Sequence, residues 1–395
     1  MFLVVSLVRA PVKIMPAFTR KIFGSPLRRR PWLATGFLLW LAAVLTGCGG
    51  FFTPQTSTGG GGTTVTPKFA YAANFNNGGT GNVSGYTINS STGALTGVTG
   101  SPFAAATGPV AVGADSAGKF LYAANKGGGV SAYAINRTDG TLTAISGSPF
   151  TTGTSPAGIA VDPQGRWVYV ANGGSADISS FNINATTGAL TGLSSPTSAG
   201  GTPVFITVDP TGRFVYVALG SAGIGVFKIN SDGSLNSIRT VSSKPCAGAV
   251  SIALDQNSRF AFVADGSTGV CSYAVNASSG DLLLINGSSA VAAGTTPNSL
   301  AVTPAGKFLY VANQGSNSLS AYGVNSDGSL SAFSGTINTG GSPAWVTVDP
   351  SGAFVYAANS ADNTISVFTI SSSGALTANG TISTGTGPVS VIATQ

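Results

Sequence analysis

Short runs in which apolar and polar residues alternate recur along most of the chain. The run Lys119–Asn125 (KFLYAAN) returns with small changes at Arg166–Asn172 and at Lys307–Asn313. An aromatic residue at the centre of this run occurs seven times, at intervals of 46 to 51 residues: Tyr71, Tyr122, Tyr169, Tyr216, Phe262, Tyr310 and Tyr356. A repeat of that length, built from short strands, is typical of a β-propeller blade. The pattern predicts an all-β fold, a seven-bladed β-propeller, because each sheet buries both faces only between two neighbours.

Residues 156–195 show how one repeat is built. Residues 156–161 and 166–171 alternate as strands, and the segment between them, Asp162–Gly165, has the composition of a type I turn. A third strand is expected at 177–183, and a fourth begins after the next turn. The repeat therefore predicts a four-stranded antiparallel blade whose first strand lines the central channel.

The two ends of the repeat region are incomplete blades. Lys68–Tyr71 has the pattern of a second strand with no first strand before it, whereas Pro388–Ile392 has the pattern of a first strand with no blade after it. We expect these segments to pair, so that the C-terminal strand closes the ring and removes an exposed sheet edge. Residues 67–395 are accordingly predicted to form one propeller domain.

A different pattern occupies the N-terminus. Basic residues at Arg28–Arg30 precede an apolar run that ends at the small residues before Cys48. Residues 1–47 are predicted to be a lipoprotein signal peptide, with Cys48 as the lipidated residue and 48–66 as a flexible Gly/Thr-rich tether. The alternative is an ordinary signal peptide or an uncleaved membrane anchor. Export could follow either the general secretory or the twin-arginine pathway, and translation could start at Met15 instead of Met1. We expect an exported protein, lipid-anchored in the bacterial cell envelope at the outer membrane or cell surface.

Charge and composition exclude several kinds of function. The chain contains no His, and its 12 acidic residues are all Asp. Catalytic triads and metal sites that depend on His are therefore excluded, and we expect no metal and no other cofactor. Seven of the 18 Lys and Arg residues precede Cys48, which leaves 11 basic and 12 acidic residues in the rest of the chain. Because the folded part has no excess of basic residues, we do not expect it to bind nucleic acid. We also expect the protein to be a monomer.

Most of the remaining charges follow the repeat. An Asp opens the turn between the first and second strands of five repeats, and a Lys or Arg commonly follows four residues later: Asp115, Asp162, Asp209, Asp255 and Asp349. We expect these residues to form turn-flanking ion pairs on one rim of the propeller. Such pairs stabilise a surface by less than about 1 kcal/mol each, so their role is architectural.

The turn and strand sequences also resemble those of a known family. The phrase DPTGRFVYVA occurs at 209–218, with close copies at 162–171 and 349–357. The turn TGAL occurs at 92–95 and 187–190. These segments resemble the seven-bladed lactonase family, which includes bacterial 6-phosphogluconolactonase and fungal carboxymuconate cyclase, and related surface proteins with Tyr-Val-Thr-Asn repeats. The resemblance covers about residues 65–395 and implies a propeller and hydrolysis of a lactone ring. It also implies a catalytic set of His, Arg and Glu, but this chain has neither His nor Glu.

On the opposite rim, the turns between second and third strands carry a set of polar side chains. Five repeats end the second strand with Asn, and one ends it with Asp265; the asparagines are Asn74, Asn125, Asn172, Asn313 and Asn359. One interpretation is structural, because Asn side chains bond readily to the main chain of a turn. The alternative is a ring of amides that binds a polyhydroxylated ligand, with Asp265 as a candidate general base.

Further candidates are expected on this same rim. Two are cations and two are carboxylates: Lys126, Lys244, Asp177 and Asp362. Either lysine could stabilise an oxyanion, and either carboxylate could contact a ligand. Phe205 and Trp345 occupy first-strand positions at which the other repeats have small residues. These aromatics could stack on a sugar ring, or they could plug the channel.

Two cysteines and two possible functions complete the predictions. Cys246 and Cys271 fall on one rim of one blade, and in an exported protein we expect them to form a disulfide.

The function favoured by the sequence is a tethered binding platform for a glycan, a peptide or an envelope protein. The alternative is a lactone-ring hydrolase in which Asp265 activates water while Lys126 or Lys244 stabilises the oxyanion.

Overall fold

The computed structural model describes Thr66 and residues 68–395, apart from 194, 242–245, 247, 268 and 286–289. The predicted signal peptide, Cys48 and most of the predicted tether lie outside the described residues, and so does Lys244. The described residues belong to one compact unit, Gly61–Gln395.

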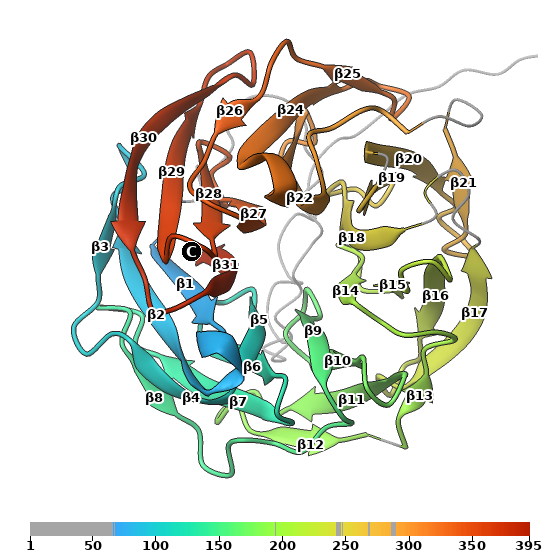
Figure 1. The fold of residues 1–395 in the computed structure, drawn as a ribbon. Helices are drawn as coiled ribbons and strands as arrows, with labels where there is room; N and C mark the ends of the chain where they lie inside the picture. Colours follow the sequence, from blue (N-terminus) through green and yellow to red (C-terminus); the bar gives the residue numbers. More distant parts are fainter. Residues whose placement is uncertain are drawn as a thin grey trace, which may run out of the picture. The chain divides into compact units, whose positions relative to one another are not determined.

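Seven antiparallel sheets stand side by side around a central axis (Figure 1). From the innermost strand outwards, blade 1 contains β31 (Pro388–Thr394), β1 (Phe69–Asn74), β2 (Thr80–Ile88) and β3 (Leu95–Gly97), and β4 (Phe103–Thr107) also pairs with β2. Blade 2 contains β5 (Pro109–Ala114), β6 (Phe120–Asn125), β7 (Val130–Ile135) and β8 (Leu142–Ala144). Blade 3 contains β9 (Pro156–Val161), β10 (Trp167–Asn172), β11 (Asp177–Ile183), β12 (Leu190–Gly192) and β13 (Thr197–Ser198).

The remaining blades repeat the same plan. Blade 4 contains β14 (Phe205–Val208), β15 (Phe214–Ala218), β16 (Ile224–Ile229) and β17 (Leu235–Val241), and blade 5 contains β18 (Ala249–Leu254), β19 (Phe260–Asp265), β20 (Gly269–Val275) and β21 (Leu282–Leu284). Blade 6 contains β22 (Pro297–Val302), β23 (Phe308–Asn313), β24 (Ser318–Val324), β25 (Leu330–Ala332) and β26 (Ile337–Asn338). Blade 7 contains β27 (Pro343–Val348), β28 (Phe354–Asn359), β29 (Thr364–Ile370) and β30 (Leu376–Ser383). Two short 3-10 turns, η1 (Asn76–Gly78) and η2 (Gln314–Ser316), follow β1 and β23.

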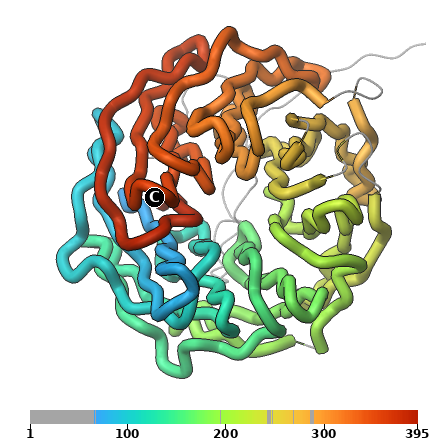
Figure 2. Tube along the Cα trace, in the orientation of Figure 1, coloured from blue at the N-terminus to red at the C-terminus, as the bar shows by residue number. Residues whose placement is uncertain are grey.

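The last strand closes the ring. β31 pairs antiparallel with β1, with Thr394 opposite Phe69 and Ile392 opposite Tyr71. In the trace of Figure 2, the red C-terminal segment lies beside the blue N-terminal strand. The prediction of seven four-stranded blades closed by the C-terminal strand is confirmed. The short strands β4, β13 and β26 were not predicted; each pairs with the third strand of its own blade.

The two ends of the ring differ in chemistry. We call one end the amide face: second strands end there, at residues such as Asn74 and Asn125, and the connections into the innermost strands cross it. We call the other end the aspartate face. It carries the connections between first and second strands, which include Asp115 and Asp162, and those between third and fourth strands.

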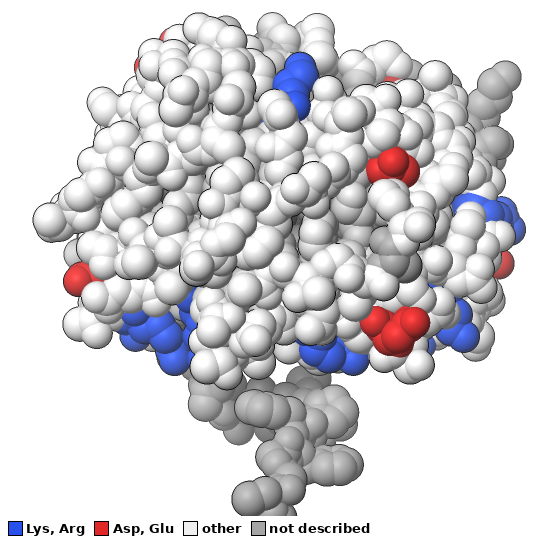
Figure 3. Space-filling view, turned by 90° about the horizontal axis from the view of Figure 1, so that it is seen from below, with Lys and Arg blue, Asp and Glu red and all other residues white. Residues whose placement is uncertain are grey.

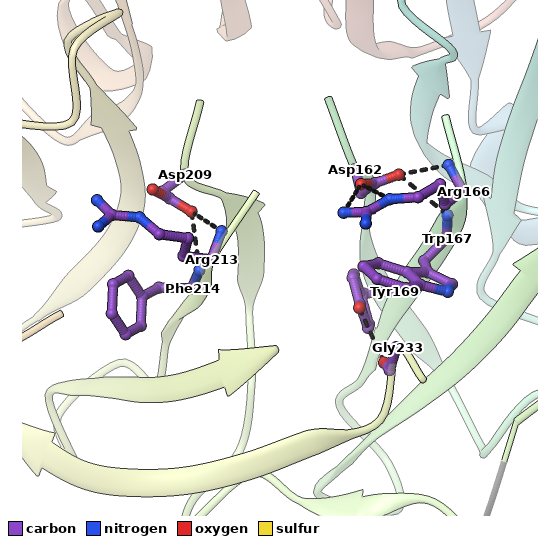
Figure 4. Close-up of polar contacts among 8 residues, drawn as sticks. All are labelled: Asp162, Arg166, Trp167, Tyr169, Asp209, Arg213, Phe214 and Gly233. Carbon is purple, nitrogen blue, oxygen red and sulfur yellow. Dashed lines mark hydrogen bonds and ion pairs between the residues drawn. The ribbon is translucent and has the colours of Figure 1, made fainter. Parts of the chain in front are cut away.

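The turn aspartates act mainly on the backbone. Asp162 is buried, and its carboxylate accepts hydrogen bonds from the backbone N–H groups of Arg166 and Trp167 (Figure 4). The same arrangement recurs at Asp115, Asp209, Asp255 and Asp349, and the Thr303 hydroxyl replaces the carboxylate in blade 6. Within the described residues, ion pairs with the base four positions later form at Asp162 and Asp255. The predicted pairs at Asp115 and Asp209 are not formed, so the prediction of ion pairs was wrong for those two turns.

Each blade is held to the next by an aromatic residue that opens the second strand. Its ring packs on a glycine in the turn between the third and fourth strands of the following blade, where φ lies between 73° and 86°. A Cβ at that glycine would lie 2.3 to 2.6 Å from the ring, so only glycine fits. The seven pairs are Phe69–Gly140, Phe120–Gly188, Trp167–Gly233, Phe214–Gly280, Phe260–Gly328, Phe308–Gly374 and Phe354–Gly93.

A tyrosine two residues further along the second strand contacts the same glycine. Its hydroxyl donates a hydrogen bond of 2.8 to 2.9 Å to the glycine carbonyl, as Tyr169 does to Gly233 in Figure 4. The tyrosines are Tyr71, Tyr122, Tyr169, Tyr216, Tyr310 and Tyr356, all fully buried. We call the ring contact and this hydrogen bond together the inter-blade clamp. Between blades 5 and 6 the clamp lacks its hydrogen bond, because Phe262 occupies the tyrosine position.

Changing the clamp hydroxyl should change stability in both directions. Tyr356→Phe leaves the Gly93 carbonyl without its donor and should lower the free energy of unfolding by about 1–2 kcal/mol. Phe262→Tyr supplies the missing donor and should raise that free energy by up to about 1 kcal/mol. Urea unfolding followed by circular dichroism measures both changes.

Tyr273→Phe is the matched control. The Tyr273 hydroxyl is buried but makes no hydrogen bond in the described part of the chain, so its removal should cost little. If all three variants unfolded at the same urea concentration as the parent, the clamp hydrogen bond would not contribute to stability.

Alkaline pH should weaken the clamp. Burial, as the largest cause, raises the pKa of all six clamp tyrosines above the ordinary value of 10.0. Above pH 10 the unfolded chain therefore loses protons that the folded chain keeps, and the free energy of unfolding falls as the pH rises. The contribution of the clamp to stability should be constant below about pH 9 and decline above pH 10, and absorbance at 295 nm should show clamp tyrosines ionising together with unfolding. Ionisation of these tyrosines near pH 10 in the folded protein would contradict their burial.

Candidate functional site

The five asparagines of the amide face are fully buried. Each side-chain nitrogen donates a hydrogen bond of 2.8 to 3.1 Å to a serine hydroxyl on the third strand of its own blade: Asn74 to Ser84, Asn125 to Ser131, Asn172 to Ser179, Asn313 to Ser320 and Asn359 to Ser366. In four blades a glycine of the connection into the innermost strand covers the carboxamide, as Gly153 covers Asn172. A ligand on this face cannot reach such amides, so the burial favours the structural interpretation.

Asp265 also lies inside the fold. Its side chain is fully buried, and its two oxygens accept hydrogen bonds from Gly248 N–H, at 2.8 Å, and from the N–H and hydroxyl of Ser267, at 2.8 and 2.6 Å. These bonds fasten two connections of blade 5 to each other. A general base has to reach a water molecule beside the substrate, and this carboxylate is enclosed by backbone and a serine. The geometry favours a positioning role in the loop over a catalytic one.

A hollow of about 440 Å³ lies on the aspartate face, and another, of about 420 Å³, lies on the amide face beside blades 2, 3 and 4. We call the second one the amide-face hollow. Its lining is mostly apolar and contains one charged side chain, Lys126; the other lining residues are Val110, Ser155, Pro156, Ala157, Gly173, Gly174, Thr202, Pro203 and Val204. The Lys126 Nζ lies 5.6 Å from the centre of the Phe75 ring. The hollow thus offers an apolar surface with one exposed lysine, Lys126, in its lining.

The two predicted ligand-binding carboxylates hold loops on the amide face. Asp177 Oδ1 accepts a hydrogen bond of 2.7 Å from Asn172, and Asp362 Oδ2 accepts one of 2.6 Å from Gly341 N–H. Neither residue lines the amide-face hollow. The structure therefore brings Lys126 to the hollow, but it does not bring the predicted carboxylates there.

Phe205 and Trp345 meet although their blades are not neighbours. Phe205 belongs to β14 of blade 4, and Trp345 belongs to β27 of blade 7, on different sides of the ring axis (Figure 1). Their ring centres are 5.7 Å apart, with an interplanar angle of 37°. Both side chains are half-buried. A contact between these blades has to cross the central channel, so the geometry favours the plug over a free stacking platform.

Blade 5 contains a disulfide on the amide face. Cys246 and Cys271 are joined, with their Cα atoms 6.2 Å apart, and both are buried. Cys246 precedes the innermost strand β18, whereas Cys271 lies in β20. The bond therefore holds the connection into blade 5 against the third strand of that blade, next to Asp265.

The charges are unevenly distributed over the surface. Among the described residues, many Lys and Arg lie in or beside aspartate-face turns: Lys68, Lys119, Arg137, Arg166, Arg213, Lys228, Arg259 and Lys307. In the side view of Figure 3, most visible Lys and Arg side chains lie along one edge of the ring. Within the described residues, no group of three His, Cys, Asp or Glu could hold a metal ion, and no helix is long and apolar enough to span a membrane.

Fold and sequence together define the class of protein. The chain is a closed seven-bladed propeller whose repeats supply their own inter-blade contacts. The family model for "Lactonase, 7-bladed beta-propeller" matches residues 69–393, and the chain therefore belongs to that family.

Three similar solved structures share less than 25% sequence identity with this chain. A putative 6-phosphogluconolactonase from Bacteroides uniformis is similar, with 22% identity over 83% of this chain and 100% of that chain, and a TM-score of 0.73. A protein from Lactobacillus plantarum has 24% identity over 83% and 100% of the two chains, with a TM-score of 0.71. The periplasmic gluconolactonase of Pseudomonas aeruginosa has 19% identity over 83% and 99%, with a TM-score of 0.70. No curated protein matches the chain.

Apart from Lys126, the residues that line the amide-face hollow were not among the candidates predicted from the sequence. Pro203 and Val204 lie in the connection into β14, and Ala157 lies in β9; these apolar residues approach one another only when neighbouring blades pack. No sequence signal marks Val204, because its exposure, 39% of its surface, is visible only in the packed structure.

Removal of the disulfide should destabilise the propeller without unfolding it at room temperature. The bond closes a loop with a sequence separation of 25, for which chain entropy predicts a loss of about 3.5 kcal/mol. Cys246→Ser/Cys271→Ser and the reduced parent protein should therefore unfold at a similarly lower urea concentration. A reduced protein as stable as the oxidised one would show that blade 5 does not depend on this bond.

Proposed function

We propose that this protein hydrolyses a sugar-type lactone in the amide-face hollow. The observation that carries the proposal is the position of Lys126, an exposed lysine in the otherwise uncharged and mostly apolar lining of a hollow of about 420 Å³. A lactone has an apolar ring face and a carbonyl oxygen that becomes negative during hydrolysis, and this hollow complements both features. Membership of the lactonase family and the names of two similar proteins, a putative 6-phosphogluconolactonase and a gluconolactonase, support the same substrate class.

The reaction needs little protein chemistry beyond this charge. A water oxygen forms a bond to the lactone carbonyl carbon, and negative charge gathers on the carbonyl oxygen, where the Lys126 ammonium stabilises it. The ring C–O bond then breaks, and the ring oxygen takes up the proton that the attacking water releases through solvent. The product is the open hydroxy acid. Because an ester of this kind is already reactive toward water, electrostatic stabilisation without a strong base would still accelerate it.

A second function, ligand binding without turnover, is favoured by one observation. The residues that line the hollow include no carboxylate, and Asp265 is enclosed elsewhere in blade 5. A hollow with one cation and no base suits a receptor for a carbohydrate, an aldonic acid or an acidic group of an envelope protein.

The proposed location bears on the substrate. The predicted signal peptide and lipidation at Cys48 would bring the propeller out of the cytoplasm, and one similar protein is named a periplasmic gluconolactonase. An exported enzyme would meet an unphosphorylated lactone, so gluconolactone is the first substrate to test and its 6-phosphate the second.

Replacing the ammonium group should separate the two functions. With gluconolactone as substrate and the spontaneous rate subtracted, Lys126→Ala should lower kcat/KM by about 100-fold, because one stabilising group for the oxyanion is lost. A pH-indicator assay of acid release measures this rate. Lys119→Ala, which removes an exposed lysine on the aspartate face, is the matched control and should leave kcat/KM unchanged.

Asp265→Asn tests the other candidate. If the buried carboxylate only holds the loop, this variant should keep its kcat/KM within about threefold and lose some thermal stability. Abolished turnover with unchanged unfolding would make Asp265 catalytic and overturn the assignment to Lys126. Absence of any rate above the spontaneous reaction, with gluconate binding that Lys126→Ala removes, would replace the hydrolase by the receptor.

A further inference from the structure

The hollow on the aspartate face has a different chemistry. It lies where blades 3, 4 and 5 meet, has a volume of about 440 Å³ and is lined by three basic side chains and no acidic one: Arg166, Arg213 and Lys228. Neutral polar residues complete one wall, among them Asn230, Ser231 and Ser278. We call this the basic hollow. It is separate from the amide-face hollow, because the two lie at opposite ends of the ring.

Two of the three cations have no carboxylate partner. Arg166 is neutralised, since its guanidinium pairs with Asp162 at 2.8 Å and lies over the Trp167 ring (Figure 4). Within the described residues, neither Arg213 nor Lys228 makes an ion pair.

Arg213 is positioned without being neutralised. Its Nε donates to the Thr211 hydroxyl at 2.7 Å, and its guanidinium also donates to the Ala277 carbonyl of blade 5 at 2.5 Å. The nearby Asp209 is fully buried, and its oxygens accept hydrogen bonds from Thr211 and from two backbone N–H groups. These contacts hold a guanidinium at the edge of the hollow while the adjacent carboxylate is already occupied.

Lys228 departs from the repeat at this point. It lies opposite Phe214 on the neighbouring strand, and the equivalent positions of the other six blades are all uncharged: Thr87, Ala134, Asn182, Ala274, Gly323 and Thr369. The clamp does not need a lysine here, because it forms in the blades that lack one. The added charge therefore belongs to the hollow and not to the architecture.

We propose that the basic hollow binds a phosphate ester. A fixed guanidinium and a flexible ammonium together match a tetrahedral oxyanion, which accepts several hydrogen bonds and carries the opposite charge. The hollow is larger than a single phosphate, and its asparagine and serine side chains suit the hydroxyl groups of a small polar carrier such as glycerol. Two kinds of molecule carry such a phosphate ester group: a soluble phosphate ester, and a membrane lipid with a glycerophosphate headgroup.

Two alanine variants test the site, and the chain itself indicates that both will fold. Alanine already occupies the position of Arg213 in blade 7, as Ala353, and the position of Lys228 in blade 2, as Ala134. With glycerol 3-phosphate as the soluble probe, calorimetry at low salt should give a Kd at least tenfold weaker in Arg213→Ala and in Lys228→Ala than in the parent. Co-sedimentation with phosphatidylglycerol vesicles, compared with phosphatidylcholine vesicles, tests the headgroup source with the same proteins.

Lys307→Ala is the matched control, because it removes an exposed base at the equivalent turn of blade 6 on the same face. The proposal holds if either probe binds the parent and Lys307→Ala at least tenfold more tightly than it binds the two blade 4 variants, and the probe that does so identifies the source. Equal weakening in Lys307→Ala would reduce the effect to general surface charge, and no binding of either probe would also overturn the proposal. Lys126→Ala should leave phosphate-ester binding in the basic hollow unchanged. The test of the basic hollow can therefore be told apart from the test of lactone hydrolysis in the amide-face hollow.

Discussion

The structure depends on one contact that each blade makes with the next: an aromatic ring packs on a glycine, and at six of the seven interfaces a tyrosine hydroxyl bonds to the same glycine. The ring requires a residue without Cβ, and the hydroxyl requires that residue's carbonyl to face back across the interface. Neither requirement is met within a single blade. Stability is therefore shared around the circle, and pairing of β31 with β1 is needed because it brings Phe354 and Tyr356 of blade 7 to Gly93 of blade 1.

This constraint accounts for most of the repeated residues. In the run from Lys119 to Asn125, the Phe and the Tyr form the clamp, the Asn bonds to a serine of the third strand, and the small residues between them pack inside the blade. The repeat describes the architecture and carries no information about a ligand. Function has to be sought where a blade departs from the repeat, as at Lys126, Lys228, Phe205 and Trp345.

The fold could be predicted from the sequence because its determinants are local and periodic. Strand alternation, turn residues and the incomplete blades at 68–74 and 388–394 lie within short segments, and those segments pair as expected. The site was harder to predict, because exposure is a property of packed blades. The position of Asn172 in the repeat identified the turn that it begins. The side-chain amide of Asn172, however, is buried by Gly153, about twenty residues earlier in the chain. The contact between Phe205 and Trp345 depends on the width of the ring, which no single repeat encodes.

The two departures at Asp265 and Lys126 illustrate why a different residue is not by itself a functional one. Asp265 differs from the asparagines of the other blades, yet blade 5 explains it: the connection held by the disulfide presents the Gly248 N–H, which requires an acceptor. At Lys126 no comparable need exists: the ammonium group lies 5.6 Å from the centre of the Phe75 ring, and within the described residues it makes no hydrogen bond or ion pair. A departure that satisfies a buried partner is architecture, whereas a charge left at the edge of an apolar hollow has its complement outside the chain.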